Sequence, residues 1–187
     1  MSTEDDTALI AKLPKAELHL HLEGSIELET AVELAARHGI ALTREEVAAR
    51  YQYKDFLGFI EAFKWVTSFL REPADYALIT DRLAETLLRQ NVIYAEVTLS
   101  VGVMLWRKQD VEANFIAICE AGDRARTKGL RLQWIFDCVR QWGPEAAMEV
   151  ARVAVQCQNK GVVAFGMGGD ELSRPAEDFR AVYDYAA

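Results

Sequence analysis

Apolar residues follow two patterns along this chain: short continuous runs and longer segments with helical spacing. Four of the runs are rich in β-branched and aromatic residues and are bounded by turn residues, which predicts strands. The runs lie within 17–25, 92–99, 130–136 and 162–165. Most of them are apolar on both sides, as are the strands of a parallel sheet covered by helices.

Segments with apolar residues three and four positions apart separate these strands and predict helices. Between the first two strands, helices are expected from Ser25 to Gly39, from Thr43 onward, across 56–66 and from Pro73 to near Asn91. Ser25 is expected to cap the first helix, and Thr43 to open the second with a capping box. We therefore predict a helical insertion over residues 25–91, between strands one and two.

Three further helices are expected after the second strand, from about Asp110 to Lys128, from Pro144 to Gly161, and from a start at Ser173 and Pro175. Strand and helix thus alternate four times, which predicts an α/β fold in a single domain over residues 1–187.

The carboxyl ends of parallel strands meet at one rim, where reactive groups gather. Polar clusters lie at or near all four predicted strand ends. They are His19 with His21, Thr98 to Ser100, Asp137 to Arg140, and Gly166 to Glu171. We expect these clusters to converge on one site.

Two histidines one residue apart, His19 and His21, are the strongest chemical signal in the chain. Side chains alternate across a strand, so both imidazoles are expected on one face, where they can share a divalent metal. Imidazole nitrogen is a preferred zinc ligand. The alternative is a strand whose polar face carries histidine by chance. The third histidine, His38, lies near a predicted helix end and is interpreted as structural.

The composition excludes several classes of protein. The chain has 187 residues, of which 51% are hydrophobic and 27% charged, as in an ordinary globular protein. Its net charge of -8 leaves no basic field for a nucleic-acid polymer. The start is acidic, and no apolar stretch approaches the ~20 residues that cross a bilayer, so we expect a cytoplasmic protein without a membrane partner. The three cysteines are widely spaced and are expected to be reduced.

The segment 13–25, Leu-Pro-Lys-Ala-Glu-Leu-His-Leu-His-Leu-Glu-Gly-Ser, resembles the opening of the adenosine deaminase family, whose members are metal-dependent aminohydrolases on a (β/α)8 barrel. Residues 168–171, Gly-Gly-Asp-Glu, resemble the second signature of that family. The resemblance runs from about Leu13 to the end of the chain. It implies that the four strands are the amino-terminal half of a TIM-type barrel.

The resemblance also implies an activity, the hydrolytic deamination of a 6-aminopurine nucleoside such as adenosine or aminodeoxyfutalosine. It implies that His19 and His21 bind zinc, that Glu23 lies near the ribose hydroxyls, and that the Gly169 N–H faces the purine, where glycine permits close backbone approach. A plain turn glycine is the alternative at Gly169. Asp137 and Arg140, after the third predicted strand, are expected either to contact the substrate or to pair with each other.

The chain departs from the family pattern in length, because a complete barrel needs about 250 residues and eight strands. The other zinc ligands and the proton-handling glutamate are expected beyond Ala187, so no catalytic residue is expected within this chain. Two ligands leave zinc short of its usual four, and we expect weak metal binding and no deaminase activity from this chain alone. The open strand edges are expected to be covered by a missing carboxy-terminal half or by self-association.

Two details of the substrate stay open. Residues 98–102, Thr-Leu-Ser-Val-Gly, resemble the bacterial subgroup that includes aminodeoxyfutalosine deaminases rather than the Arg-x-Ser-Pro pattern of adenosine deaminases. Phenylalanines at helical spacing form either an apolar lid over the ribose end or part of the core; they are Phe56, Phe59, Phe63 and Phe69. The competing functions are another aminohydrolase, such as an adenine or N6-modified nucleotide deaminase, and a noncatalytic half-barrel assembly module.

Overall fold

A computed structural model describes residues 3–187, and these residues contain one four-stranded sheet. Its strands, in the order in which they lie side by side, are β1 (Lys15–His21), β2 (Val92–Leu99), β3 (Arg131–Val139) and β4 (Val162–Gly168). Every neighbouring pair is parallel, which confirms the predicted four parallel strands. Within the described residues, β1 and β4 each keep one unpaired edge.

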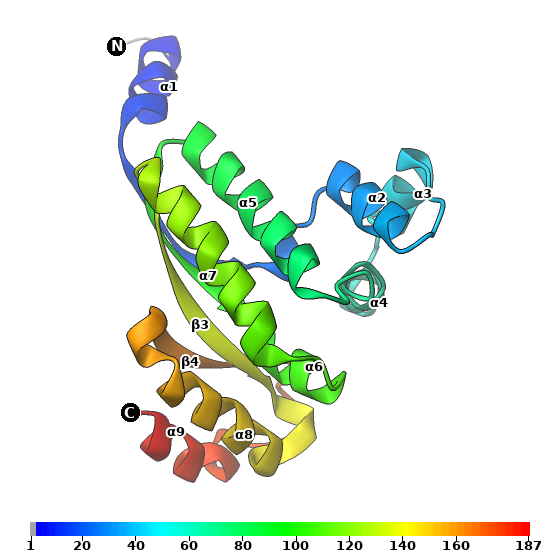
Figure 1. The fold of residues 1–187 in the computed structure, drawn as a ribbon, viewed down its shortest axis with the longest axis vertical. Helices are drawn as coiled ribbons and strands as arrows, with labels where there is room; N and C mark the ends of the chain where they lie inside the picture. The colour runs from blue at the N-terminus through cyan, green and yellow to red at the C-terminus, as the bar shows by residue number, and fades with distance from the viewer. Residues whose placement is uncertain (1–2) are drawn as a thin grey trace.

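Helices and 3-10 turns connect the strands (Figure 1). Helix α1 (Thr3–Lys12) precedes β1. Between β1 and β2 lie η1 (Glu23–Ser25), α2 (Leu28–Arg37), α3 (Arg44–Arg50), α4 (Phe56–Thr67) and α5 (Pro73–Arg89). Between β2 and β3 lie α6 (Val101–Trp106) and α7 (Val111–Thr127). The remaining elements are η2 (Arg140–Trp142), α8 (Gly143–Gln156) and η3 (Gln158–Lys160) before β4, and η4 (Ala176–Phe179) and α9 (Arg180–Ala186) after it.

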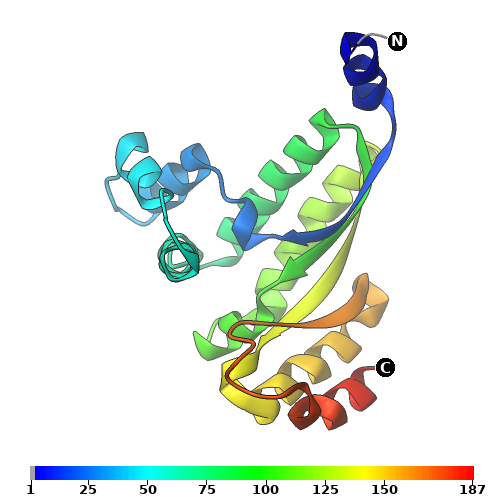
Figure 2. The same cartoon turned by 180° about the vertical axis from the view of Figure 1, so that it is seen from behind.

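The helices cover only one face of the sheet. Helices α5 and α7 lie side by side against it, and α9 packs on α8 farther along the same layer (Figure 1). Seen from behind, the strands lie in front of these helices, and no helix of residues 3–187 covers them (Figure 2). The strand residues that point toward the helices form the core, and Ala95, Val97 and Leu99 of β2 are fully buried. The result is the predicted half barrel, with its inner face open.

Several helix ends form as the sequence predicts. At α3, the Thr43 hydroxyl accepts the Glu46 N–H and the Glu46 carboxylate accepts the Thr43 N–H, so the capping box is confirmed. Pro73 occupies the first turn of α5. The prediction that Ser25 caps α2 is wrong, because its hydroxyl donates to the Leu22 carbonyl in η1 and α2 begins only at Leu28. The chain makes a 3-10 turn first, and this turn uses the serine.

Two helices, α1 and α6, are not predicted from the pattern. Helix α6 is short and almost entirely apolar, so it has no polar face to reveal a helical period. Strands β3 and β4 each run three residues beyond the predicted end, because glycine and polar residues on the open face interrupt the apolar run. Asp137 therefore lies within β3 rather than after it.

His38 has the structural role that was expected. Its Nε2 lies 2.8 Å from the carboxylate of Asp75, which is fully buried. Asp75 also accepts the backbone N–H groups of Arg71 and Glu72. The pair therefore ties the end of α2 to the start of α5 and holds the helices between β1 and β2 together.

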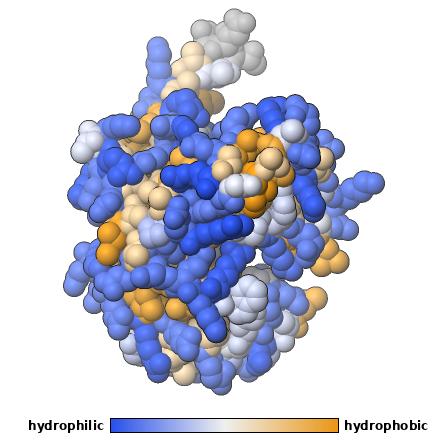
Figure 3. All heavy atoms as spheres, turned by 45° about the vertical axis from the view of Figure 1, so that its right-hand side comes forward, coloured by the Kyte–Doolittle hydropathy of each residue, from blue (hydrophilic) through white to orange (hydrophobic). Residues whose placement is uncertain are grey.

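A row of aromatic side chains runs along α4, and it is exposed at Phe56 but only partly exposed at Phe59 and Phe63. Phe56 is 63% exposed, and the rings of Tyr53, Phe59 and Phe63 continue the row at centroid distances of 5.4 to 6.1 Å. Phe69 is only 4% exposed and belongs to the core, which excludes it from any lid. The surface on this side of the molecule is mainly hydrophilic, with separate apolar patches (Figure 3). Across residues 3–187, no helix is both long enough and apolar enough to cross a membrane.

Candidate metal and substrate site

The two imidazoles of β1 lie next to each other, as the alternation of side chains along a strand predicts. The ring centroids of His19 and His21 are 5.7 Å apart, and the ring planes are inclined by 58°. His21 is half-buried, and burial together with the neighbouring His19 lowers its pKa. A lowered pKa keeps the imidazole neutral, which is the form that donates to a metal.

The donor set fits part of a zinc site. Two neutral imidazoles are suitable zinc ligands, and a tetrahedral site needs two more. Within residues 3–187, no group of three or more histidine, cysteine, aspartate or glutamate side chains is arranged to hold a metal ion. The three cysteines are free, and they lie at positions 119, 138 and 157, away from the pair in sequence. His19 and His21 can therefore supply half of the ligands.

Glu23 is held at the same rim by the end of β2. It lies in η1, is 3% exposed, and its Oε1 accepts the backbone N–H of Ser100 at 2.9 Å. Its Oε2 is buried and has no hydrogen-bond partner among the described residues. Burial raises the pKa of the Glu23 carboxyl, although the Ser100 N–H and the nearby Arg107 charge favour the ionised form. The free oxygen is an acceptor without a donor.

Asp137 provides a second such acceptor at the end of β3. It is 9% exposed, and its Oδ1 is buried without a partner in the described chain. Burial, with a smaller contribution from the charge of Glu23, raises the pKa of Asp137 to about 7, and the Gly168 N–H opposes this rise. A Cβ on Gly168 would lie 2.8 Å from the Asp137 Oδ2, so the glycine leaves room for the carboxyl.

Arg140 points toward the loop after β4. Its Nη1 donates to the carbonyl of Arg174 at 3.1 Å. The ion pairs found within residues 3–187 do not include one between Arg140 and Asp137, so the second of the two expected arrangements is not formed. A contact of Arg140 or Asp137 with a substrate remains a prediction.

Gly169 directly follows β4 and has a φ of +98°, a conformation that favours glycine. A Cβ at this position would collide with the Oε1 of Gln141. The same Gln141 oxygen accepts the N–H of Asp170 at 3.0 Å. The turn therefore requires a glycine for reasons internal to the protein, while the contact of Gly169 with a purine remains a prediction.

Two residues near the site carry no signal in the sequence. Gln141 contacts the Gly169 turn, and Arg107 donates to both the carbonyl and the hydroxyl of Thr67, at 2.6 and 3.2 Å. Arg107 thereby fastens α4 to the rim beside Glu23. In the sequence, a single glutamine or arginine near a short helix or turn cannot be distinguished from a solvated surface residue. The contacts of Gln141 and Arg107 form only in the folded chain.

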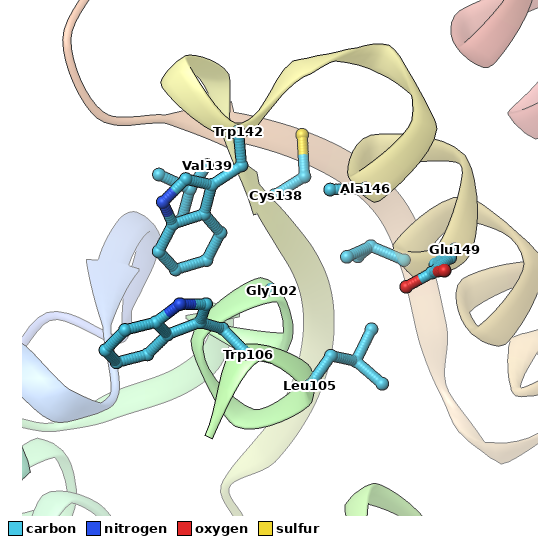
Figure 4. Close-up of a pocket in the computed structure, with 9 residues that line it drawn as sticks. Gly102, Leu105, Trp106, Cys138, Val139, Trp142, Ala146 and Glu149 are labelled. Carbon is cyan, nitrogen blue, oxygen red and sulfur yellow. The ribbon is translucent and has the colours of Figure 1, made fainter. Parts of the chain in front are cut away.

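A cavity of about 200 Å³ lies on the helix side of this rim (Figure 4). The indoles of Trp106 and Trp142 line it in a stacked arrangement, with centroids 5.6 Å apart and planes inclined by 21°. Glu149 of α8 lies across the cavity from the two indoles. The histidine pair does not line this cavity. The stacked indoles join η2, through Trp142, to α6, through Trp106.

Comparisons with known proteins agree with this geometry. Residues 14–187 match the model of the adenosine deaminase family. The chain is 37% identical over 185 residues to the aminodeoxyfutalosine deaminase of Streptomyces avermitilis, which covers 96% of this chain and 52% of that protein. It is 30% identical over 175 residues to the adenine deaminase of Rhizobium leguminosarum bv. trifolii, covering 93% of this chain and 54% of the relative. The chain thus spans about half the length of the curated relatives it matches.

Solved structures share the fold. An amidohydrolase from Burkholderia ambifaria with bound zinc is 25% identical and superposes with a TM-score of 0.84, over 100% of this chain and 52% of that one. The adenine deaminase from Arthrobacter aurescens is 24% identical, also with a TM-score of 0.84, over 92% of this chain and 54% of that one. The sequence motifs, the half barrel and the family match agree, and the chain belongs to the adenosine deaminase family.

Proposed function

We propose that this chain is the amino-terminal half of a zinc-dependent hydrolase that removes the 6-amino group of a purine nucleoside as ammonia and leaves the 6-oxo product. The observation that carries the proposal is the pair of adjacent imidazoles at the carboxyl end of β1, in a half barrel of the adenosine deaminase family. In parallel α/β barrels, this rim is where substrates react.

Each site residue has a proposed role. His19 and His21 hold the zinc ion, and the lowered pKa of His21 favours its neutral, metal-donating form. When bound, zinc supplies Lewis-acid chemistry, which makes water a usable nucleophile near neutral pH. Glu23 and Asp137 offer buried oxygens without partners, which suits hydrogen-bond donors such as the sugar hydroxyls. Arg140 at the rim and the Gly169 N–H complete the contacts to the substrate.

Other parts of the site come from polypeptide beyond these 187 residues. Two more zinc ligands are needed, and a group that protonates the departing amine is needed as well. Relatives about twice as long as this chain support a carboxy-terminal half as the source. Self-association of two copies covers the open strand edges but brings only a second copy of the same side chains. We therefore expect no deaminase activity from the 187-residue chain alone.

The nucleoside class is supported by the aminodeoxyfutalosine deaminase relative at 37% identity. Free adenine is the second candidate, because an adenine deaminase is 30% identical over 93% of the chain. The nucleosides carry a sugar, and free adenine does not. The sugar of a nucleoside brings hydroxyl donors for the unpartnered oxygens of Glu23 and Asp137, and free adenine has no hydroxyl groups, which favours the nucleoside.

Ammonia release tests the proposal. We expect the full-length product of the gene to release ammonia from aminodeoxyfutalosine or adenosine, with adenine a poor substrate, and the 187-residue chain to release none. Inactivity of the zinc-loaded full-length protein on both nucleosides would reject the substrate class. Faster turnover of adenine than of either nucleoside would favour the second candidate.

A further inference from the structure

Three consecutive residues of η2 contact two other segments of the chain, the loop after β4 and helix α6. Arg140 donates to the carbonyl of Arg174, in the loop after β4. Gln141 accepts the N–H of Asp170, at the start of that loop. Trp142 stacks on Trp106 of α6, which holds the turn in place from the other side (Figure 4). The η2 turn is therefore a junction, and Gln141 is the member that reaches the Gly169 turn.

Gly169 and Asp170 offer two consecutive backbone N–H groups at the rim. The Asp170 N–H is bound by Gln141, and the Asp170 carbonyl accepts both the hydroxyl and the N–H of Ser173. The Gly169 N–H donates to no residue within 3–187, and Gly169 is exposed. One donor of the pair is thus occupied and the other is free.

The Gly169 N–H lies in the peptide plane between Gly168 and Gly169. Glycine has more backbone freedom than any other residue, so this plane can turn unless the chain is held on both sides of the glycine. The plane before Gly169 continues β4, which pairs with β3 up to Gly168. The plane after it is held by the bond from Asp170 to Gln141. The side chain of Gln141 also fills the place where a Cβ on Gly169 would lie. Gln141 therefore removes the freedom that the glycine introduces.

We propose that Gln141 is a positioning residue that orients the Gly169 N–H for its hydrogen bond to the purine base. This inference rests on the proposed function, in which Gly169 contacts the base. A bond made equally in the bound substrate and in the transition state changes KM and leaves kcat unchanged. Gln141 is thus expected to act on substrate binding and not on the chemical step.

The test is carried out on the full-length protein with three variants. We expect Gln141→Met, which keeps the length of the side chain and removes the acceptor, to raise KM for the nucleoside about tenfold at unchanged kcat, since tenfold corresponds to about 1.4 kcal/mol, the size of one hydrogen bond. Gln141→Glu retains an acceptor oxygen and is expected to keep KM within about twofold of the wild type. Gln156→Met, at an exposed position of α8 without a side-chain hydrogen bond, is the matched control and is expected to change neither constant.

Hydrogen exchange of the 168–174 segment, followed by mass spectrometry, provides a readout that does not depend on activity. We expect faster exchange in Gln141→Met than in the wild type and in Gln156→Met, because the Asp170 N–H loses its acceptor. Faster exchange with an unchanged KM would overturn the positioning role. Unchanged exchange would also overturn the positioning role, because it would mean that Gln141 does not hold the Asp170 N–H. The exchange of the 168–174 segment could depend on Gln141 while the wild type deaminates neither nucleoside. That result would reject the proposed function and leave the contact between Gln141 and Asp170 in place.

Discussion

At the scale of single residues, two buried carboxyl groups distinguish the rim of the sheet from the rest of the chain. Glu23 and Asp137 each keep a buried oxygen with no hydrogen-bond partner in the described residues. Buried polar atoms without partners are rare and costly, and they often mark a ligand site. Sugar hydroxyls would supply the missing donors, which is why both residues belong to the proposed substrate contacts.

The raised pKa of Asp137 predicts a pH-dependent stability. Burial raises the folded-state pKa to about 7, whereas an unfolded aspartate titrates at about 3.9. The folded chain therefore holds this proton more tightly, and stability falls as the pH rises between these values. We expect the free energy of unfolding of the wild type to fall by about 2–3 kcal/mol relative to Asp137→Asn between about pH 5 and about pH 8.

Urea unfolding at the two pH values measures this difference. Asp184→Asn removes an exposed carboxyl in α9 and is the control. We expect its free energy of unfolding to change between the two pH values by the same amount as that of the wild type. If Asp137→Asn showed the same pH dependence as the wild type, burial would not raise the pKa of Asp137, and this prediction would be wrong.

Residues differ in how far the sequence reveals their roles. The shared face of His19 and His21 follows from strand alternation alone, so it could be predicted. The role of Gln141 depends on a contact with Asp170, 29 residues later, and no local pattern encodes it. The orientation of Arg140 toward Arg174 could not be predicted for the same reason.

At the scale of elements, local signals predict the helix ends whose caps lie within a few residues. The Thr43 capping box and Pro73 at the start of α5 are examples. The pattern places the ends of β3 and β4 three residues too early, because residues such as Asp137 and Gly168 break the apolar run. The same residues make the site, so the pattern is least informative where function is located.

The capping box at α3 yields a prediction at this scale. Thr43→Ala removes the hydroxyl that accepts the Glu46 N–H, and loss of such a cap costs about 1 kcal/mol. We expect the free energy of unfolding to fall by about that amount, because Val47 of α3 is fully buried and couples the helix to the core. Thr127→Ala, at the end of α7, removes only a hydroxyl that bonds to its own helix and serves as the control. Equal losses in the two variants in urea unfolding would contradict the capping role.

At the scale of the whole molecule, the half barrel exposes two strand edges and an uncovered sheet face. Exposed strand edges are templates for pairing with another chain. Leu18 in β1 and Val163 in β4, both at the edges, are 59% and 50% exposed. The number and direction of the strands could be predicted from the alternating pattern, whereas the open inner face became evident only from the arrangement of the helices on one side.

The open edges predict self-association of the 187-residue chain. We expect its average mass in light scattering to rise with concentration, and we expect Leu18→Lys and Val163→Lys to reduce this rise, because charges at edges oppose strand pairing. Leu57→Lys, on α4 and 74% exposed, removes an apolar side chain away from both edges and is the control. A chain that stays monomeric at all concentrations, or a control that acts as strongly as the edge variants, would contradict this prediction.

The proposed function requires that His19 and His21 bind the same zinc ion. The most direct measurement is the zinc content of the purified full-length protein and of its His19→Ala, His21→Ala and His38→Gln variants, determined by elemental mass spectrometry. We expect about one zinc ion per chain in the wild type and in His38→Gln, and loss of most of the metal in His19→Ala and in His21→Ala. Full retention of zinc in either His19→Ala or His21→Ala would contradict a zinc site shared by the two histidines.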